Sequence, residues 1–199
     1  MFKPLVQGVF NVTWPMIVIS VVILISLRVS YFIKYKNEKR FIFYKELLIL
    51  SFIIYIMCLF QVVTMEDLSG IGSNNFIPFK EILRYNITSR LFFKNILGNI
   101  LLFLPYGFFT SYLLQNRKYS LSFMLTFIAS FSIEVVQLII GRVFDVDDII
   151  LNICGGSIGF LIFYIIDVLW DKLPKFIRKE FVLNILSILI LVFLIVILF

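Results

Sequence analysis

The sequence contains no histidine among its 199 residues. Ser–His and Cys–His catalysis both need an imidazole base, so these mechanisms are excluded. Zinc and haem sites that depend on histidine ligands are excluded for the same reason. The two cysteines, Cys58 and Cys154, lie in separate apolar stretches without metal-ligand spacing, so the sequence predicts no disulfide framework.

Charged residues are also scarce. They make up 15% of the chain, whereas hydrophobic residues make up 61%, including 24 phenylalanines, and the mean hydropathy is +1.05. Soluble domains are usually about a quarter charged. Long Ile, Leu and Phe runs of this extent exceed what a water-soluble core of this size can enclose, so we predict an integral membrane protein.

The apolar runs predict an all-α, polytopic transmembrane helical bundle of about six helices, forming a single membrane domain over residues 1–199. Each run is close to the roughly 20 residues that cross the hydrocarbon core of a bilayer. The six predicted spans are residues 14–33, 41–63, 96–114, 121–140, 149–170 and 181–199.

The net charge of +6 predicts membrane topology rather than nucleic-acid binding, because Lys and Arg lie mostly in the loops between apolar runs. These residues are more numerous in the loops after the first, third and fifth spans. The positive-inside rule therefore predicts that those loops are cytoplasmic. We expect a bacterial cytoplasmic membrane protein with both termini outside and with no nucleic-acid partner.

The loop between the second and third spans, residues 64–94, differs from the others. It begins polar and then becomes amphipathic, with Phe79, Ile82 and Leu83 at helical spacing. This pattern predicts a short helix lying on the outer membrane surface. A solvated linker with a few apolar contacts is the alternative interpretation.

The third span contains two amides four residues apart, Asn95 and Asn99, which lie on one helix face. Pro105 permits a kink, and Gly107 allows close packing nearby. Amides in such positions either bridge neighbouring transmembrane helices or form part of a functional site, and both interpretations stay open here.

The fourth span contains Glu134 and Gln137, which share a helix face, with Ser130 one turn earlier. A carboxylate inside the membrane is costly unless it is protonated or has a cationic, amide or metal partner. Glu134 is therefore a candidate functional residue.

The loop after the fourth span contains Arg142 and leads through acidic residues into the fifth span. Asp145 or Asp147 is expected to cap that helix, since acidic groups suit the positive end of its dipole. Asp148 and Asn152 are four residues apart on one face. Farther along, Gly155, Gly156 and Gly159 predict close helix contact.

These residues lie near the same ends of three consecutive helices, so we predict that they form one outward-facing polar pocket. Arg142 and the amides could hold a phosphate or carboxylate, and Glu134 could transfer a proton. No metal ligand is assigned, although acidic oxygens leave Mg²⁺ or Ca²⁺ open. The candidate catalytic residues are Glu134, Arg142 and Asp148, and the candidate ligand-binding residues are Asn95, Asn99, Gln137, Asp145 and Asn152.

The order and spacing of the same residues resemble the VanZ family of bacterial membrane proteins over residues 73–165. Tyr106 departs from the aliphatic residue that is more usual at its position. The motifs are Asn74-Asn-Phe-Ile-Pro-Phe79, Asn95-xxx-Asn99-Ile-Leu-Leu-Phe-Leu-Pro105-Tyr-Gly107, Glu134-xx-Gln137, Arg142 and Asp145-Val-Asp-Asp148-xxx-Asn152-xx-Gly155-Gly156.

The resemblance implies a cell-envelope protein that lowers susceptibility to teicoplanin-like glycopeptide antibiotics. The expected ligand is a lipid-linked cell-wall component or the antibiotic itself, bound or modified at the outer leaflet. Whether a covalent reaction occurs is left open. A proton-coupled transporter or lipid flippase, a structural scaffold and a metal enzyme are the alternatives.

Overall fold

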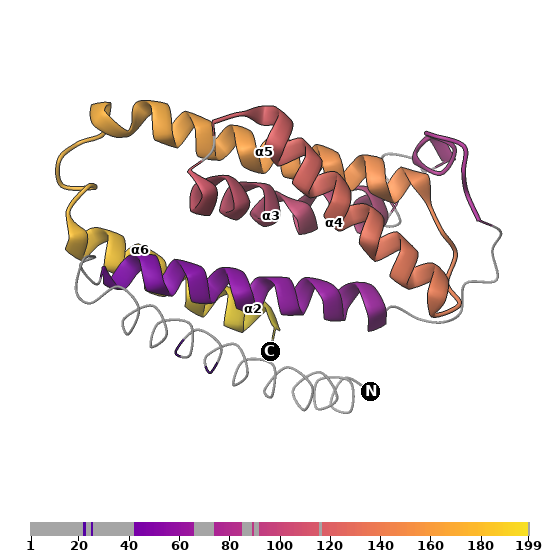
Figure 1. Ribbon diagram of the computed structural model, residues 1–199, viewed down its shortest axis with the longest axis horizontal. Coiled ribbons are helices and arrows are strands. Elements are labelled where there is room, and N and C mark those ends of the chain that lie inside the picture. Colours follow the sequence, from indigo (N-terminus) through magenta and orange to yellow (C-terminus); the bar gives the residue numbers. More distant parts are fainter. Residues whose placement is uncertain are drawn as a thin grey trace, which may run out of the picture. The chain divides into compact units, whose positions relative to one another are not determined.

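The computed structural model describes residues 22, 25, 42–65, 74–84, 89, 92–115 and 117–198. Every regular element in these residues is a helix, so the predicted all-α class is confirmed for this part of the chain. The elements, drawn in Figure 1, are α2 (Phe43–Met65), η1 (Ile82–Arg84), η2 (Phe92–Leu97), α3 (Gly98–Leu114), α4 (Tyr119–Ile139), α5 (Val146–Leu169), η3 (Trp170–Lys172) and α6 (Glu180–Leu198).

The described helices coincide with five of the predicted apolar spans, whereas the predicted span at residues 14–33 lies outside the described residues. Within the residues that the structure describes, three helical stretches are long and apolar enough to cross a membrane: Asn95–Leu114, Tyr119–Ile139 and Val146–Lys172. The apolar helix Glu180–Val196 is shorter. A total of six spans is therefore not confirmed, and the predicted orientation of the termini stays a prediction.

Two compact units make up the chain, and each is described by itself. Residues Leu59–Asp171 form one unit, which contains α3, α4 and α5. The other consists of Met1–Cys58 and Lys172–Phe199 and includes α6 and most of α2. All of the candidate site residues belong to the first unit.

Close backbone contact holds α3 and α5 side by side (Figure 1). A methyl group added at Gly155 would overlap the backbone of Ile100, and one at Gly159 would overlap the backbone of Leu104. Gly107 and Gly156 meet in the same way. The predicted small-residue contact is thus confirmed, and it requires glycine because any larger residue would separate the two helices.

The third helix of this unit, α4, packs on α5 through a polar face rather than through glycine alone. Its buried residues include Ser122, Thr126, Ser130, Glu134 and Gln137, which recur at helical spacing. Its exposed face contains Phe123, Phe127 and Phe131. The apolar side therefore faces outward and the polar side inward, as expected of a helix whose solvent is lipid.

Candidate functional site

The polar residues meet at one end of the α3–α5 unit, where the loop between α4 and α5 turns back into a helix. α4 ends beside Gly141, which has a positive φ of 87° that favours glycine. Asp145 is the N-cap of α5, and its side chain accepts a hydrogen bond from the Asp147 N–H at 2.9 Å. This confirms that one of the two predicted aspartates caps the helix.

A segment from far away in the sequence closes over this end, and we call residues 74–84 the cap segment. Asn75 forms an isolated parallel bridge with Asp145. Its N–H donates to the Phe144 carbonyl at 2.8 Å, and its carbonyl accepts from the Val146 N–H at 3.0 Å. The Asn75 amide also donates to Asp145 Oδ1 at 2.8 Å. Asn75 thereby fixes the cap segment to the helix start.

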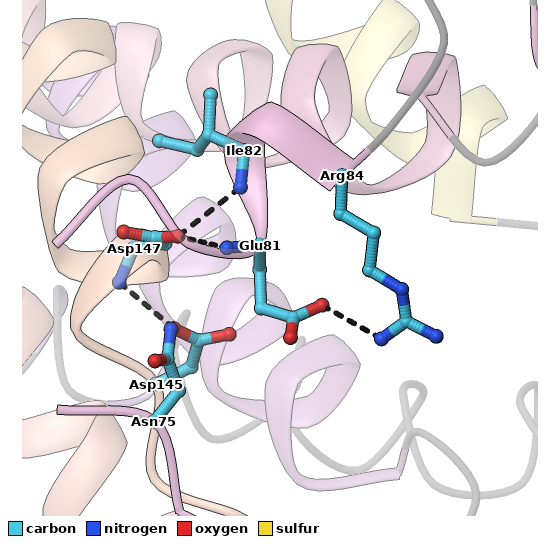
Figure 2. A network of polar contacts seen from close by, with 6 residues as sticks. All are labelled: Asn75, Glu81, Ile82, Arg84, Asp145 and Asp147. Atoms are coloured by element: carbon cyan, nitrogen blue, oxygen red, sulfur yellow. Dashed lines mark hydrogen bonds and ion pairs between the residues drawn. The ribbon is translucent and has the colours of Figure 1, made fainter. Parts of the chain in front are cut away.

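Asp147 holds the rest of the cap segment. Its carboxylate accepts hydrogen bonds from three backbone N–H groups within four residues, those of Phe79, of Glu81 at 2.7 Å and of Ile82 at 3.1 Å. Figure 2 shows the side chain facing the Glu81 and Ile82 nitrogens. Asp147 is only 1% exposed, so these donors take the place of water around its charge.

The cap segment does not have the conformation that its apolar spacing predicts. Its described residues form turns and the single 3₁₀ turn η1, so the predicted amphipathic surface helix is not confirmed. Phe79 has a φ of 66°, a left-handed conformation that costs a non-glycine residue about 1–2 kcal/mol. The three hydrogen bonds to Asp147 offset this strain, because each bond to a charged group contributes about 1.5–3 kcal/mol.

Beneath the cap segment lies a polar cleft of about 190 Å³. Four acidic side chains and one arginine line it, and Arg142 is the only basic residue among its described lining residues. The lining residues are Glu81, Ile82, Asn95, Ile96, Asn99, Arg142, Asp145, Asp147, Asp148 and Leu151.

Five of the predicted site residues meet at this cleft. They are Asn95, Asn99, Arg142, Asp145 and Asp148. Asn95 and Asn99 both line it, as their spacing predicts. The Asn99 amide donates to Asp148 Oδ1 at 2.6 Å and thereby joins the beginning of α3 to the beginning of α5.

The other three predicted site residues, Glu134, Gln137 and Asn152, are buried behind the cleft rather than in its lining. Glu134 Oε2 accepts the Asp145 N–H at 2.9 Å, so a backbone amide is its hydrogen-bond partner and it supports the cleft wall from inside. Gln137 lies one helical turn farther along α4. Its backbone carbonyl accepts a hydrogen bond from the Arg142 backbone N–H at 2.9 Å.

Asn152 joins α5 to α4 at a deeper level. Its amide nitrogen donates to Ser130 Oγ at 2.9 Å, whereas its buried Oδ1 has no hydrogen-bond partner among the described residues. The contact between the helices therefore uses the amide nitrogen of Asn152 but not its oxygen.

Burial shifts the acid–base behaviour of Asp145, which lies outside the apolar spans. Desolvation raises the pKa of its carboxyl, and the nearby charges of Asp147 and Glu81 raise it further. The hydrogen bonds from the Asn75 amide and the Asp147 N–H act in the opposite direction. The net effect is a pKa above the ordinary value, so the site favours the protonated form of Asp145 more than water does.

The acidic residues of the cleft do not form a recognisable metal centre. Among the described residues, no group of three or more His, Cys, Asp or Glu side chains is arranged to hold a metal ion. Asp147 and Asp145 are instead occupied by hydrogen bonds from the protein.

Sequence reasoning missed part of the site. The sequence pattern places Glu81 and Ile82 in a surface helix or linker and Asn75 in the polar stretch before it, and it predicts Asp147 as a helix cap. The signal for Asn75 was available in the Asn-Asn-Phe-Ile-Pro-Phe motif. Nothing in the local pattern of Asp147 revealed that it binds backbone 65 to 68 residues away in the chain.

Residues 41–167 match the family model described as VanZ/LLP1. No curated protein and no solved structure matches the chain. Because the family model covers well over half of the sequence, the chain belongs to the VanZ/LLP1 family, and its long apolar helices make it a membrane protein of the VanZ type.

Proposed function

We propose that this VanZ-type membrane protein protects the bacterial cell envelope against teicoplanin-like glycopeptides by binding the head group of a lipid-linked cell-wall component in the polar cleft. The observation that carries the proposal is the cleft itself, which gathers Arg142, the amides Asn95 and Asn99 and several carboxylates under the cap segment at one end of three apolar helices.

The size of the cleft favours a head group over the antibiotic. Pockets that enclose whole drug-sized ligands measure about 300–1,000 Å³. The cleft measures about 190 Å³, which suits one phosphate or sugar rather than an entire glycopeptide.

The charges of the cleft define the chemistry of the proposed ligand. Arg142 would hold a phosphate or carboxylate by charge-assisted hydrogen bonds. Asp148 and Glu81 would accept hydrogen bonds from hydroxyl, amide or ammonium groups. A phosphate linked to a sugar or peptide carries both kinds of group, as lipid-linked cell-wall intermediates do.

Asp145 would serve as the acid–base group if the bound head group is modified, and Glu134 would position it. The Glu134 carboxylate contacts the Asp145 backbone, and the Asp145 side chain lines the cleft. Binding without a reaction requires only that Glu134 keep the cleft wall in place. In both cases the cleft is the site that binds the head group.

Complementation tests the proposal. In a host lacking the gene, we expect Arg142→Ala and Glu134→Gln to lose teicoplanin protection at unchanged protein level in the membrane. Arg117→Ala is the matched control, because Arg117 contacts Asp167 away from the cleft, near the other ends of the helices. Full protection by both cleft variants would refute the proposal.

One observation favours a transporter or lipid flippase as the second candidate. Buried polar residues follow α4 from Ser122 through Thr126 and Ser130 to Glu134, a path of about 18 Å at 1.5 Å per residue. The buried Asn152 Oδ1, which has no hydrogen-bond partner in the described part of the chain, lies beside this path. Flux driven by a pH gradient in reconstituted vesicles, lost in Glu134→Gln, would favour this candidate; lipid binding without flux would exclude it.

A divalent cation bound in the cleft is a separate prediction. Glu81, Asp145 and Asp148 are hard oxygen ligands of the type that Mg²⁺ or Ca²⁺ prefers. Protection or ligand binding that survives chelation would remove a metal-dependent mechanism.

A further inference from the structure

The cap segment exposes large apolar side chains on the side that faces away from the protein. Leu83 is 82% exposed, Phe76 is 64%, Ile77 is 63% and Phe79 is 53%. Scattered exposed apolar residues are ordinary, whereas four of them within eight residues form a patch that requires an explanation.

This exposure is built into the fold, because the backbone that carries the patch is fixed at both ends. Asn75 pairs with the loop before α5, and Asp147 binds the N–H groups of Phe79, Glu81 and Ile82. The Asn75 side chain also accepts the Ile77 N–H at 3.2 Å. The buried carboxylate of Asp147 thus stabilises a backbone conformation in which the apolar side chains of the cap segment are exposed.

A chain of ring contacts through the buried Phe144 links the patch to the exposed aromatic residues of α4. Phe76 stacks on Phe144 with ring centroids 5.4 Å apart, and Phe144 meets Phe131 edge-on at 6.4 Å. Phe131 in turn stacks on Phe127 at 6.0 Å. Phe127 and Phe131 belong to a helix long and apolar enough to cross a membrane, so their exposed faces are lipid-facing.

The same segment also forms part of the polar cleft. Glu81 and Ile82 line the cleft, whereas Phe79 and Leu83, their close neighbours in sequence, are exposed. Figure 2 shows the backbone nitrogens of Glu81 and Ile82 facing Asp147, whereas the Glu81 side chain forms an ion pair with Arg84 at 3.2 Å. One short stretch of chain therefore separates the polar cleft from an apolar surface that continues the lipid-facing side of α4.

We propose that the cap segment is seated in the head-group layer of the bilayer, with its apolar side chains among the lipid acyl chains, so that the cleft receives its ligand laterally from the membrane. The occupant of the apolar patch is bilayer lipid, and the ligand is a molecule with a polar head and a lipid tail. This inference rests on the proposed function for the identity of the site and adds the route by which the ligand enters.

Fluorescence quenching in nanodiscs tests where the patch lies. A tryptophan is introduced by Leu83→Trp in a background of Trp14→Phe and Trp170→Phe. Lipids brominated just below the head groups should quench it within about twofold of Leu138→Trp, an exposed position in the last turn of α4. Lys118→Trp, between α3 and α4, is the water-facing control and should be quenched by aqueous iodide instead.

The opposite pattern would overturn the inference. If iodide quenches the Leu83→Trp variant as strongly as the Lys118→Trp variant, and brominated lipid does not quench it, the patch faces water. A patch covered by a second copy of the chain would resist both quenchers and would also overturn the inference.

Ligand binding tests the lateral route. We expect Leu83→Gln to weaken binding of a lipid-linked cell-wall precursor in nanodiscs about tenfold and to leave binding of its soluble, tail-free head group unchanged. Leu83→Phe keeps an apolar residue and should bind both like the wild type. Equal effects of Leu83→Gln on both probes would overturn the lateral route.

The two proposals fail in different ways. If the proposed function is wrong, Arg142→Ala retains teicoplanin protection although brominated lipid still quenches the Leu83→Trp variant. If only the present inference is wrong, Arg142→Ala loses protection and precursor binding, whereas the Leu83→Trp variant is quenched by iodide.

Discussion

Asp147 is the residue on which the conformation of the cap segment depends. Its carboxylate is buried, and its two oxygens accept hydrogen bonds from three backbone N–H groups of the cap segment. Because one of these N–H groups belongs to Phe79, the same carboxylate stabilises a left-handed backbone that an isolated chain would avoid. Asp147 therefore fixes the part of the cap segment, residues 79–82, that lies over the cleft.

Asp147→Asn should loosen the cap segment. An asparagine keeps one acceptor oxygen but places an NH₂ group opposite one or two of the N–H donors, which costs about 1–3 kcal/mol in unmade hydrogen bonds. Hydrogen exchange of the peptide containing Phe79, Glu81 and Ile82 should then be about fivefold to a hundredfold faster. Asp171→Asn, at an exposed carboxylate beyond the end of α5, should leave this exchange unchanged. Equal protection in both variants would contradict the role given to Asp147.

The raised pKa of Asp145 predicts a pH dependence of stability. Its folded-state pKa lies above the unfolded value of about 3.9, so folding favours the protonated form and stability is lost as the pH rises between the two values. Relative to Asp145→Asn, the wild type should therefore become less stable as the pH rises from about 4. Thermal unfolding in detergent at a series of pH values measures this difference.

The comparison with Asp145→Asn removes the titration of groups that the two proteins share. The charged and titratable groups nearest to Asp145 are Glu134, Asp147, Glu81 and Arg142. A wild type that gained stability over Asp145→Asn across this pH range would show that hydrogen bonding, rather than burial, dominates the environment of Asp145.

At the scale of elements, the contact between α3 and α5 positions the two helix ends that form the cleft. Gly155→Ala should separate the helices, because the new methyl group would meet the backbone of Ile100, and overpacking of this kind costs about 1–3 kcal/mol. Gly98→Ala is the matched control, since the nearest atom to its added methyl group is the Phe93 carbonyl oxygen at 3.9 Å. We expect a lower unfolding temperature for Gly155→Ala and no decrease for Gly98→Ala.

The helices and their glycine contacts could be predicted from sequence because they depend on local patterns. Apolar runs of membrane-spanning length predict the positions of the helices. The spacing of Gly155 and Gly159 predicts the face of α5 that packs closely on α3. The same reasoning placed Asn95 and Asn99 on one face, where the structure has them.

The cap segment could not be predicted in this way. The helical spacing of Phe79, Ile82 and Leu83 suggests a surface helix, but hydrogen bonds to Asp147, 65 to 68 residues away, impose a turn instead. Likewise, the spacing of Glu134 and Gln137 predicts that they share a buried face of α4. It does not predict their position behind the cleft, because that position depends on the path of the loop through Arg142 from α4 to α5. Long-range backbone contacts leave no periodic signal in the sequence.

At the scale of the whole molecule, the membrane explains why so polar a cleft stands among such apolar helices. The exposed phenylalanines of α4 belong to a helix long and apolar enough to cross a membrane, and residues near the ends of the apolar helices line the cleft. Polar groups at that level can meet lipid head groups without entering the bilayer core. The proposed ligand and the proposed seating of the cap segment both follow from this arrangement.

The most direct test of the account is the binding of a purified lipid-linked cell-wall precursor to the protein in nanodiscs. Loss of a charge-assisted hydrogen bond costs about 1.5–3 kcal/mol, so Arg142→Ala should bind the precursor at least about tenfold more weakly than the wild type, whereas Arg117→Ala should bind it equally well. Equal affinity of the wild type and Arg142→Ala, or no binding by the wild type, would contradict the account.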